Sequence, residues 1–233
     1  MTQGIFVTGT DTGVGKTVVS AGLVRLLAQQ GRRVIGLKPV ASGAERTPVG
    51  LRNADALALS AAGTVEVPYR LTNPYCFEPA VAPHLAAAEV GVELPVGELL
   101  RWYRQASAGA EVAIVEGAGG WRVPLHPDGF LSDLPEALGL GVILVVGLRL
   151  GCLNHARLTL EAIERSGRCP FLGWVGNGID PGFERLEANL ATLARLLGDP
   201  PLAVLPPLEA PHLDAVATAL GRCDRLRRLG SPR

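Results

Sequence analysis

Runs of consecutive apolar residues alternate with amphipathic stretches along most of the chain. Six runs lack apolar–polar alternation, which is typical of strands buried on both faces of a parallel sheet. These runs are residues 4–8, 33–37, 112–116, 141–147, 171–176 and 202–205. Helical patterns fall at residues 17–30, 53–61, 95–108, 154–166, 183–198 and 212–221. This order predicts one α/β domain, with a doubly wound, mostly parallel sheet and helices on both faces.

The chain, with 233 residues and a mass of 24.4 kDa, is long enough for one well-buried domain and too short for two ordinary ones. We expect this domain to span residues 1–221. Residues 41–95 are less regular and rich in proline, so they are expected to form substrate-binding loops over the sheet edge. The arginine-rich residues 222–233 are expected to be a basic tail in solvent.

Charge and cysteine usage exclude several classes of partner. The formal net charge is zero and the pI is ≈ 6.9, so no nucleic-acid or membrane partner is expected. No signal peptide is evident at the amino terminus, and the longest apolar stretch, residues 137–148, is too short to span a bilayer. The cysteines show neither a disulfide pattern nor a zinc-binding spacing. These features predict a cytoplasmic protein.

A glycine-rich turn joins the first predicted strand to the first predicted helix. Its sequence is Gly9-Thr10-Asp11-Thr12-Gly13-Val14-Gly15-Lys16-Thr17, in which Thr10 stands where the strict P-loop pattern has glycine. An ordinary strand–helix turn is the alternative, but the flanking elements and the Gly-Lys-Thr ending favour a phosphate loop. The predicted α/β domain is therefore expected to be of the P-loop NTPase type. Lys16 would then reach the outer phosphates, and the Thr17 hydroxyl would bind Mg²⁺.

The chain contains only two lysines, Lys16 and Lys38, beside 20 arginines. Lys38 ends the second apolar run, at the carboxyl edge of the predicted sheet, which is where ligands bind in such folds. Both lysines therefore lie where a phosphate-handling enzyme would need them. Ser42 follows closely, and the residues alone leave open whether it caps a turn or binds a ligand.

Two carboxylates are candidate metal ligands. Glu116 directly follows a buried strand and would face the phosphate loop, where a carboxylate is placed to hold Mg²⁺ and is costly to leave unpaired. The glycine-rich residues 117–120 would let the backbone approach a ligand closely. Asp55 lies at the start of a predicted helix, where an N-cap role for Asn53 or Asp55 is the alternative to a metal ligand.

These segments, taken in order, resemble the dethiobiotin synthetases, from the first strand to about residue 210. The segments that carry the resemblance are Gly9-Thr10-Asp11-Thr12 with Gly15-Lys16-Thr17, Lys38-Pro39-Val40-Ala41-Ser42-Gly43, Gly50-Leu51-Arg52-Asn53-Ala54-Asp55-Ala56, Asn73-Pro74-Tyr75, Val115-Glu116-Gly117-Ala118-Gly119-Gly120-Trp121, Leu150-Gly151-Cys152-Leu153-Asn154-His155-Ala156 and Gly173-Trp174-Val175-Gly176-Asn177. A set of this length in the right order is far more specific than any single motif.

The resemblance implies an ATP- and Mg²⁺-dependent ligase that joins CO₂ to 7,8-diaminononanoate through a carbamate and a carbamic-phosphoric anhydride. It implies the catalytic residues Lys38, Lys16 and Thr12, and the magnesium ligands Thr17, Asp55 and Glu116. It implies nucleotide contacts at Gly13, Val14, Gly15, Lys16, Thr17, Val18, Asp55, Glu116, Gly117, Ala118, Gly119, Asn177, Pro206, Pro207 and Leu208. Among these, Asn177 would recognise adenine. Glycine at positions 13 and 178, where some members carry acids, leaves base selectivity open.

The resemblance also implies a homodimer with a site shared across the interface. Substrate contacts would be Thr12 and Ser42, together with Gly151, Cys152, Leu153 and Asn154 of the partner subunit, whose helix start would hold the substrate carboxylate. A plain strand–helix loop capped by Asn154 is the alternative.

Partition and septum-site ATPases share the expected fold but act as nucleotide-driven switches, and they carry a lysine where this chain has Asp11. Corrin amide synthases add a glutaminase domain, for which this chain has no room.

Overall fold

A computed structural model describes residues 2–207 and 212–230. Its centre is a six-stranded sheet in the order β12-β11-β10-β1-β7-β2, with every neighbouring pair parallel. The strands are β1 (Gln3–Gly9), β2 (Val34–Leu37), β7 (Val112–Glu116), β10 (Gly141–Leu148), β11 (Phe171–Gly178) and β12 (Ala203–Leu205). Each of the six predicted strands is present, and the predicted fold class is confirmed.

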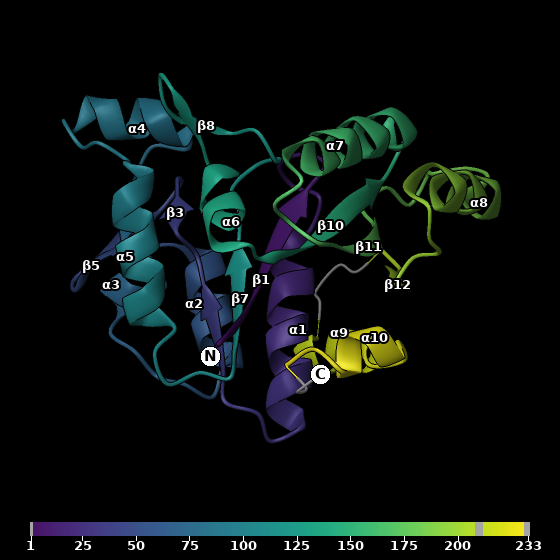
Figure 1. Cartoon of the computed structure of the whole chain (residues 1–233), viewed down its shortest axis with the longest axis horizontal. Coiled ribbons are helices and arrows are strands. Elements are labelled where there is room, and N and C mark those ends of the chain that lie inside the picture. Colours follow the sequence, from purple (N-terminus) through teal and green to yellow (C-terminus); the bar gives the residue numbers. More distant parts are fainter. Residues whose placement is uncertain (1, 208–211, 231–233) are drawn as a thin grey trace.

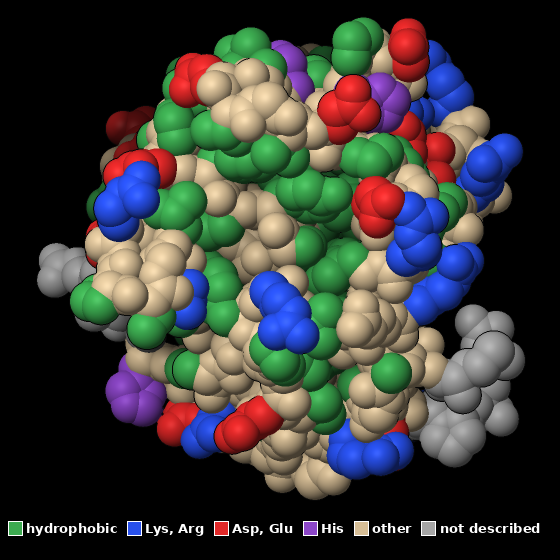
Figure 2. Space-filling view, turned by 90° about the vertical axis from the view of Figure 1, so that its left-hand side faces the viewer, with side chains coloured by type: hydrophobic (Ala, Val, Ile, Leu, Met, Phe, Trp, Pro, Cys, Tyr) green, Lys and Arg blue, Asp and Glu red, His purple; other side chains and the backbone are tan. Residues whose placement is uncertain are grey.

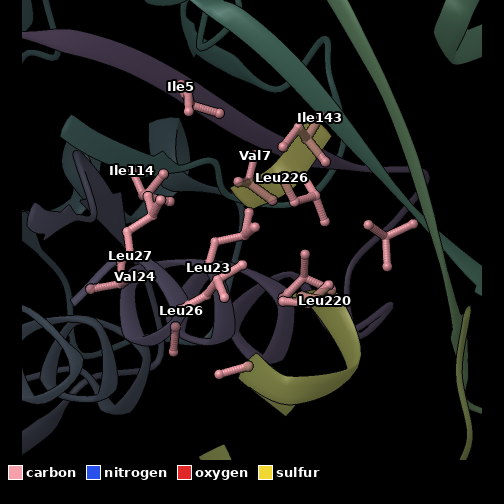
Figure 3. Close-up of a cluster of buried hydrophobic side chains, with 14 of the residues drawn as sticks. Ile5, Val7, Leu23, Val24, Leu26, Leu27, Ile114, Ile143, Leu220 and Leu226 are labelled. Carbon is pink, nitrogen blue, oxygen red and sulfur yellow. The ribbon is translucent and has the colours of Figure 1, made fainter. Parts of the chain in front are cut away.

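Successive side chains of the strands point to opposite faces of the sheet and pack into two different hydrophobic cores. In β1, Ile5 and Val7 pack on one face and Phe6 on the other, all fully or almost fully buried. The first face is covered by α1 (Lys16–Gln29), α2 (Ala54–Ala62), α9 (Leu213–Leu220) and α10 (Asp224–Arg227). Figure 3 shows leucines of α1 meeting Leu220 and Leu226 beneath Val7 and Ile143. The two-sided burial explains why the strands read as unbroken apolar runs.

The second face is covered by α5 (Val96–Ala106), α6 (Asp133–Leu138), α7 (Cys152–Ser166) and α8 (Leu186–Leu197). Figure 1 shows α7 and α8 beside β10 and β11, with α1, α9 and α10 at the opposite end of the picture. None of the helices described is long and apolar enough to cross a membrane.

Short elements fill the segment that the sequence marks as irregular. They are β3 (Val40–Ala41), β4 (Glu45–Thr47), β5 (Gly50–Arg52), α3 (Tyr69–Thr72), β6 (Tyr75–Cys76) and α4 (Pro83–Glu89). A hairpin of β8 (Pro124–His126) and β9 (Gly129–Phe130) follows β7 and packs on α4. In Figure 1 the arrows of β1 and β10 point toward the end of the molecule that carries α4, β8 and α7.

The carboxyl-terminal segment differs from the expected solvated tail. Residues 224–227 form α10, and Leu226 and Leu229 are only 1% and 8% exposed, within the core on the α1 face. The arginines of this segment suggested solvent, but the two leucines three positions apart lie on one side of a turn and can be buried while the arginines stay outside. The packed domain therefore extends past residue 221, at least to residue 230. The rest of the predicted tail, residues 231–233, lies outside the described residues.

Candidate active site

The glycine-rich turn after β1 is shaped by two left-handed residues. Gly13 and Gly15 have φ angles of 75° and 90°, a region that residues with a Cβ rarely enter. Gly15 is the N-cap of α1, and no side chain caps this helix, which leaves its first N–H groups free for an anion. Lys16 opens the helix, and its Nζ donates to the backbone oxygen of Asp11 at 2.9 Å. The turn thus presents N–H groups and an ammonium together.

An ion pair that the sequence analysis missed fixes the start of this turn. The two carboxylate oxygens of Asp11 have different partners: Oδ1 accepts from the Thr12 N–H at 2.7 Å, and Oδ2 lies 2.5 Å from Nη2 of Arg149. Arg149 directly follows β10, and β10 is the neighbour of β1. Parallel pairing of these two strands therefore places Arg149 beside a residue that is far away in the sequence.

Lys38 joins two carboxylates at the carboxyl edge of the sheet. Its Nζ lies 2.9 Å from Asp55 Oδ2 and 2.5 Å from Glu116 Oε1, and it also donates to the Gly117 backbone oxygen at 3.2 Å. Thr17 Oγ1 donates to the same Glu116 oxygen at 2.9 Å. The structure thus brings together one side chain from α1, one after β2, one from α2 and one from β7.

The two lysines have opposite pKa shifts. Burial alone would lower the pKa of Lys38, but the charges of Glu116 and Asp55 and their hydrogen bonds raise it above its usual value. Burial, followed by repulsion from Lys38, lowers the pKa of Lys16 to about 8, although the nearby carboxylates oppose this shift. Asp55 is desolvated too, yet its ion pair with Lys38 holds its pKa below the usual range. Lys38 therefore stays charged, and the pKa of Lys16 is about 8.

The sequence left open whether Asn53 or Asp55 caps α2, with a metal ligand as the alternative role for Asp55. The structure gives the capping role to Asn53. The Asn53 side chain is the N-cap of α2 and accepts from the Ala56 N–H at 3.2 Å. Asp55, two residues later, is free to turn toward Lys38 and makes the contact described above. The helix cap and the acid that contacts Lys38 are thus different residues of one short segment.

The donor set can be tested for its fit to Mg²⁺. Glu116 is fully buried, and its Oε2 has no hydrogen-bond partner among the described residues. A buried carboxylate oxygen without a donor is costly, and a hard cation with oxygen ligands would satisfy it. No group of three or more His, Cys, Asp and Glu within the described ranges could hold a metal, so the set would consist of Asp55, Glu116 and the Thr17 hydroxyl. These residues fit an ion that keeps several waters, as Mg²⁺ does.

A second network, also missed by the sequence analysis, holds the backbone around Lys38. The amide of Asn73 donates to the Lys38 backbone oxygen at 2.8 Å. The Tyr69 hydroxyl accepts from the Asn53 N–H at 2.8 Å and contacts Asn73 Oδ1 at 3.2 Å. Arg52 lies over the Tyr69 ring, 4.2 Å from its centre. One tyrosine therefore ties the start of α2 to the loop that supports Lys38.

A pocket of about 750 Å³ lies over these groups. Its lining includes half of the predicted site residues: Thr12, Gly13, Gly15, Lys16, Thr17, Lys38, Ser42, Asp55, Glu116, Ala118 and Gly119. The Ser42 hydroxyl is buried and has no hydrogen-bond partner among the described residues, so it is available to a ligand. The remaining lining comes largely from residues 80–83 and 122–124, around α4 and β8.

Asn177 is positioned against the phosphate loop. It is 6% exposed, and its amide nitrogen donates to the Val14 backbone oxygen at 3.0 Å. A Cβ on Gly15 would lie 2.0 Å from that nitrogen, so the glycine is required there by close packing as well as by its φ angle.

A smaller pocket of about 310 Å³ lies next to the end of β11, and Gly178, Pro206 and Pro207 contribute to its lining. A Cβ on Gly178 would lie 2.8 Å from Pro207, which explains a glycine at that position. Leu208, the last residue of the predicted base-lining segment, lies outside the described residues.

Residues 151–154, which were predicted to hold the substrate carboxylate of the partner subunit, do not line either pocket of their own chain. The helix α7 starts at Cys152, and its N-cap is Gly151, with φ 93° and no side-chain cap. Asn154 therefore does not cap the helix, and the capping alternative is wrong because the helix begins two residues earlier. Cys152 is buried, and Asn154 and the preceding Leu150 are exposed.

Solved structures with a similar fold are nucleotide-binding proteins of a different kind. The septum site-determining protein MinD with Mg-ADP from Pyrococcus horikoshii OT3 matches with a TM-score of 0.60 and 16% identity, covering 100% of both chains. A chain of the MinC:MinD cell division protein complex of Aquifex aeolicus matches with a TM-score of 0.58 and 17% identity, covering 99% of this chain and 97% of that chain. At such low identity these matches show the P-loop type of fold alone.

Sequence relatives show the family. A family model for an AAA domain matches residues 3–212. The ATP-dependent dethiobiotin synthetase BioD of Cellvibrio japonicus (strain Ueda107) is 47% identical over 218 residues, which is 94% of this chain and 95% of the relative. Its counterpart in Pseudomonas aeruginosa (strain UCBPP-PA14) is 51% identical over 216 residues, 92% of this chain and 94% of the relative. The chain belongs to the family of ATP-dependent dethiobiotin synthetases.

Proposed function

We propose that this chain uses ATP and Mg²⁺ to join CO₂ to 7,8-diaminononanoate and to close a ureido ring, giving dethiobiotin, ADP and phosphate in biotin biosynthesis. The observation that carries the proposal is the floor of the large pocket, where Lys38 contacts two carboxylates and Lys16, the other lysine of the chain, lines the same pocket. Family membership supports the identity of the substrates, and the geometry supports chemistry on phosphates.

The reaction converts a poor acyl donor into a good one. One substrate amine attacks CO₂ and loses a proton, which gives a carbamate. A carbamate oxygen then attacks the γ-phosphorus of ATP and ADP leaves, so that a carbamic-phosphoric anhydride forms. The second amine attacks the carbonyl carbon, phosphate leaves and the ring closes. No covalent bond to the protein is needed, so the protein contributes positioning and charge neutralisation.

The two lysines have separate tasks in this proposal. Lys16, at the start of α1, would exchange its contact with the Asp11 backbone for the outer phosphates of ATP. Lys38 would stabilise the carbamate and the phosphoryl group in transit, because its raised pKa keeps it charged throughout the physiological range. Thr12 and Ser42 line the same pocket and would contact the substrate amines or the carbamate.

Thr17, Asp55 and Glu116 would hold Mg²⁺, which when bound neutralises charge on the phosphate oxygens. The orphan Oε2 of Glu116 supports this role. Lys38 already contacts both carboxylates, so these two residues would serve the metal and the lysine together. The same carboxylates thereby hold the lysine next to the phosphates.

The smaller pocket is the proposed site of the nucleotide base, with Asn177 as the residue that reads adenine and residues 206–208 as the lining. Apolar and proline side chains dominate that pocket, and Asp180 is its only charged lining residue among those described. We expect stacking and shape to contribute more than hydrogen bonds to base recognition there.

For the apolar acid tail of the substrate, we propose a homodimer in which the start of α7 on the partner subunit approaches the pocket. The free N–H groups after Gly151 suit a carboxylate, and the absence of residues 151–154 from the lining of their own pocket is compatible with a role in trans.

The proposal is tested by measuring phosphate release with MgATP, bicarbonate and the diamine acid, each omitted in turn. A ligase releases phosphate only when the diamine and CO₂ are both present, and product with the mass of dethiobiotin accumulates in step. Phosphate release that is indifferent to the diamine would instead support a nucleotide-driven switch and overturn the proposal.

A further inference from the structure

The large pocket has two unlike parts. Its inner floor is polar and is made of Lys16, Thr17, Lys38, Asp55 and Glu116. Its outer wall is made of residues 80–83 and 122–124. The floor residues come from α1, α2, β7 and the segment after β2, so their charged groups meet only while these segments keep a fixed relative position. Buried contacts outside the pocket must therefore hold the segments together.

The hydroxyl of Tyr69, the first residue of α3, joins two of these segments. It accepts from the Asn53 N–H at 2.8 Å, donates to Asn73 Oδ1 at 3.2 Å and lies 3.7 Å from Cys76 Sγ. Burial raises the pKa of Tyr69 to about 12, so the hydroxyl keeps its proton in the physiological range. One hydroxyl thus satisfies a backbone donor before α2 and a side-chain acceptor after α3.

The bond from Tyr69 sets the orientation of the Asn73 amide. With Oδ1 turned toward Tyr69, Nδ2 donates to the backbone oxygens of Lys38 at 2.8 Å and Tyr75 at 3.1 Å. The Lys38 N–H donates to the Thr72 oxygen at 2.8 Å, so both backbone polar groups of Lys38 are bound to the α3 segment. Asn73 is 3% exposed, and a flipped amide would turn its oxygen toward the Lys38 carbonyl, where two acceptors repel each other.

On the other side of Tyr69, Asn53 holds the start of α2. Its side chain caps this helix and also donates to the Ser42 backbone oxygen at 3.4 Å. Asp55 lies in the first turn of the capped helix and reaches Lys38 Nζ at 2.9 Å. Tyr69 therefore connects the backbone that carries Lys38 to the helix start that carries Asp55.

The short helix α3 is itself anchored from outside the pocket. Arg52 lies over the Tyr69 ring, 4.2 Å from its centre, and Trp102 of α5 donates to the Leu71 oxygen at 2.8 Å. The helix packs on α5 and β2, on the side of the molecule that Figure 2 shows, where mainly hydrophobic and uncharged atoms cover the centre of the view. Tyr69 does not line the pocket, so it can act on the reaction only through the groups that it holds.

We propose that Tyr69 is a positioning residue for the floor of the pocket, and that its hydroxyl, acting through two buried asparagines, sets how Lys38 meets Asp55. This inference rests on the proposed function, which gives Lys38 the phosphoryl group in transit. Without the hydroxyl, the Asn53 N–H and Asn73 Oδ1 lose a partner, and the two segments can separate. The phosphate loop is held by contacts of its own, so ATP should bind normally and react slowly.

The test is Tyr69→Phe, which keeps the ring under Arg52 and removes only the hydroxyl. We expect kcat for the diamine acid to fall about tenfold, because a small displacement of a reacting group is costly. KM for ATP should stay within about twofold, since the phosphate loop is unaltered. Calorimetry with MgADP should show full stoichiometry, which excludes a loss of folded molecules. The Kd of the ADP complex for Mg²⁺ should rise about tenfold, because Asp55 is held less well.

Tyr103→Phe is the matched control, since it removes the same atom from a buried tyrosine at the opposite edge of the sheet. The Tyr103 hydroxyl lies against Gly4, near the start of β1, and Tyr103 does not line the pocket. This variant should keep both kcat and the Mg²⁺ affinity. An unchanged kcat in folded Tyr69→Phe, or an equal loss in Tyr103→Phe, would overturn the inference. A parallel rise in KM for ATP would assign the hydroxyl to nucleotide binding and would overturn it as well.

If Tyr69→Phe does not fold, Asn73→Asp decides by the same measurements. This variant keeps an acceptor for the Tyr69 hydroxyl and removes the donor to the Lys38 backbone. Failure of the proposed function is distinguishable, because the unmodified enzyme would then not turn over the diamine acid. The Mg²⁺ titration of the ADP complex would still show whether Tyr69 positions Asp55.

Discussion

The floor and the outer wall of the pocket are built in different ways. The floor residues lie at the ends of strands and at the starts of α1 and α2, with buried contacts between 2.5 and 2.9 Å. The outer wall comes from loops and short elements around α4 and β8, and its ion pairs are 3.5 to 3.8 Å long. Rigid elements hold groups with the precision that phosphoryl transfer needs, whereas a wall of loops can vary without disturbing them. We therefore expect the floor to determine the rate of the reaction and the wall to determine the choice of substrate.

The largest expected effect is on the floor. Glu116→Gln removes the charge that Lys38 contacts and that the proposed Mg²⁺ would use, while keeping the shape of the side chain, so turnover of MgATP with the diamine acid should fall by about 10²- to 10³-fold. Steady-state rates at saturating substrates, with Mg²⁺ varied, measure this loss and the accompanying rise in the Mg²⁺ requirement.

Glu111→Gln provides the control at the opposite end of the same strand. Glu111 immediately precedes β7 and accepts from the Arg33 N–H, far from the pocket lining. Its neutralisation should leave turnover almost unchanged. Equal rates for Glu116→Gln and the unmodified enzyme, with normal Mg²⁺ dependence, would show that Glu116 is not a metal ligand.

Mixed dimers can separate contacts within one chain from contacts across the interface. Lys38→Gln is combined with a chain whose 151–154 segment is disrupted, for example by Gly151→Val, which the φ of 93° makes unfavourable. If the start of α7 acts on the partner's site, subunit exchange should restore one working site per heterodimer. Phosphate release before and after exchange, with exchange followed by native mass spectrometry, measures the recovery. No recovery in this mixture, once exchange is demonstrated, would contradict the shared site.

The contrast between floor and wall also explains what the sequence could predict. Lys38 directly follows an apolar run, Glu116 ends another, and Lys16 closes the glycine-rich turn after the first run. Parallel strands end at one edge of the sheet, so the meeting of these residues follows from the pattern. The place of Arg122 in the pocket lining could not be predicted in this way, because its neighbours depend on the β8–β9 hairpin and on how α4 packs against that hairpin. The Asp11–Arg149 pair depends on β1 lying beside β10, which the run of elements does not reveal.

The sequence was also misleading where composition outweighed pattern. The arginines of residues 222–230 indicated a solvated tail, although Leu226 and Leu229 are spaced to pack on the α1 face. At α7, Asn154 is a good capping residue by type, but Gly151 supplies the left-handed conformation that starts the helix earlier. In both places the usual preference of a residue type predicted the structure less well than burial of the leucines or the backbone conformation of the glycine.

A third prediction uses pH to test the charge of Lys16 at the floor of the pocket. Because the pKa of Lys16 is lowered to about 8, the free enzyme loses this charge as pH rises through 8. Bound phosphates favour the protonated lysine, so Kd for ADP should be flat below pH 8 and rise up to about tenfold per unit above it. Calorimetric titrations with ADP at pH 7, 8 and 9 measure the slope.

Lys16→Met should bind ADP more weakly and with a flat profile over this range, because the titrating ammonium is gone. A slope that survives in Lys16→Met would assign the titration to another group.

The smallest expected effect concerns the ion pair that joins the phosphate loop to the segment before α7. Both side chains are partly exposed, Arg149 at 42% and Asp11 at 47%, so the pair itself should contribute only about 0.5–1 kcal/mol. Asp11 Oδ1 also holds the Thr12 N–H, however, and this link could transmit the position of Arg149 to the loop. A double-mutant cycle with Asp11→Asn, Arg149→Met and the double variant isolates the coupling in Kd for ADP. We expect each single variant to weaken binding about two- to fivefold, and the double variant to be little worse than either. Strictly additive effects would mean that the two residues act independently and that the phosphate loop is held by its own backbone and by the packing of Gly15 on Asn177.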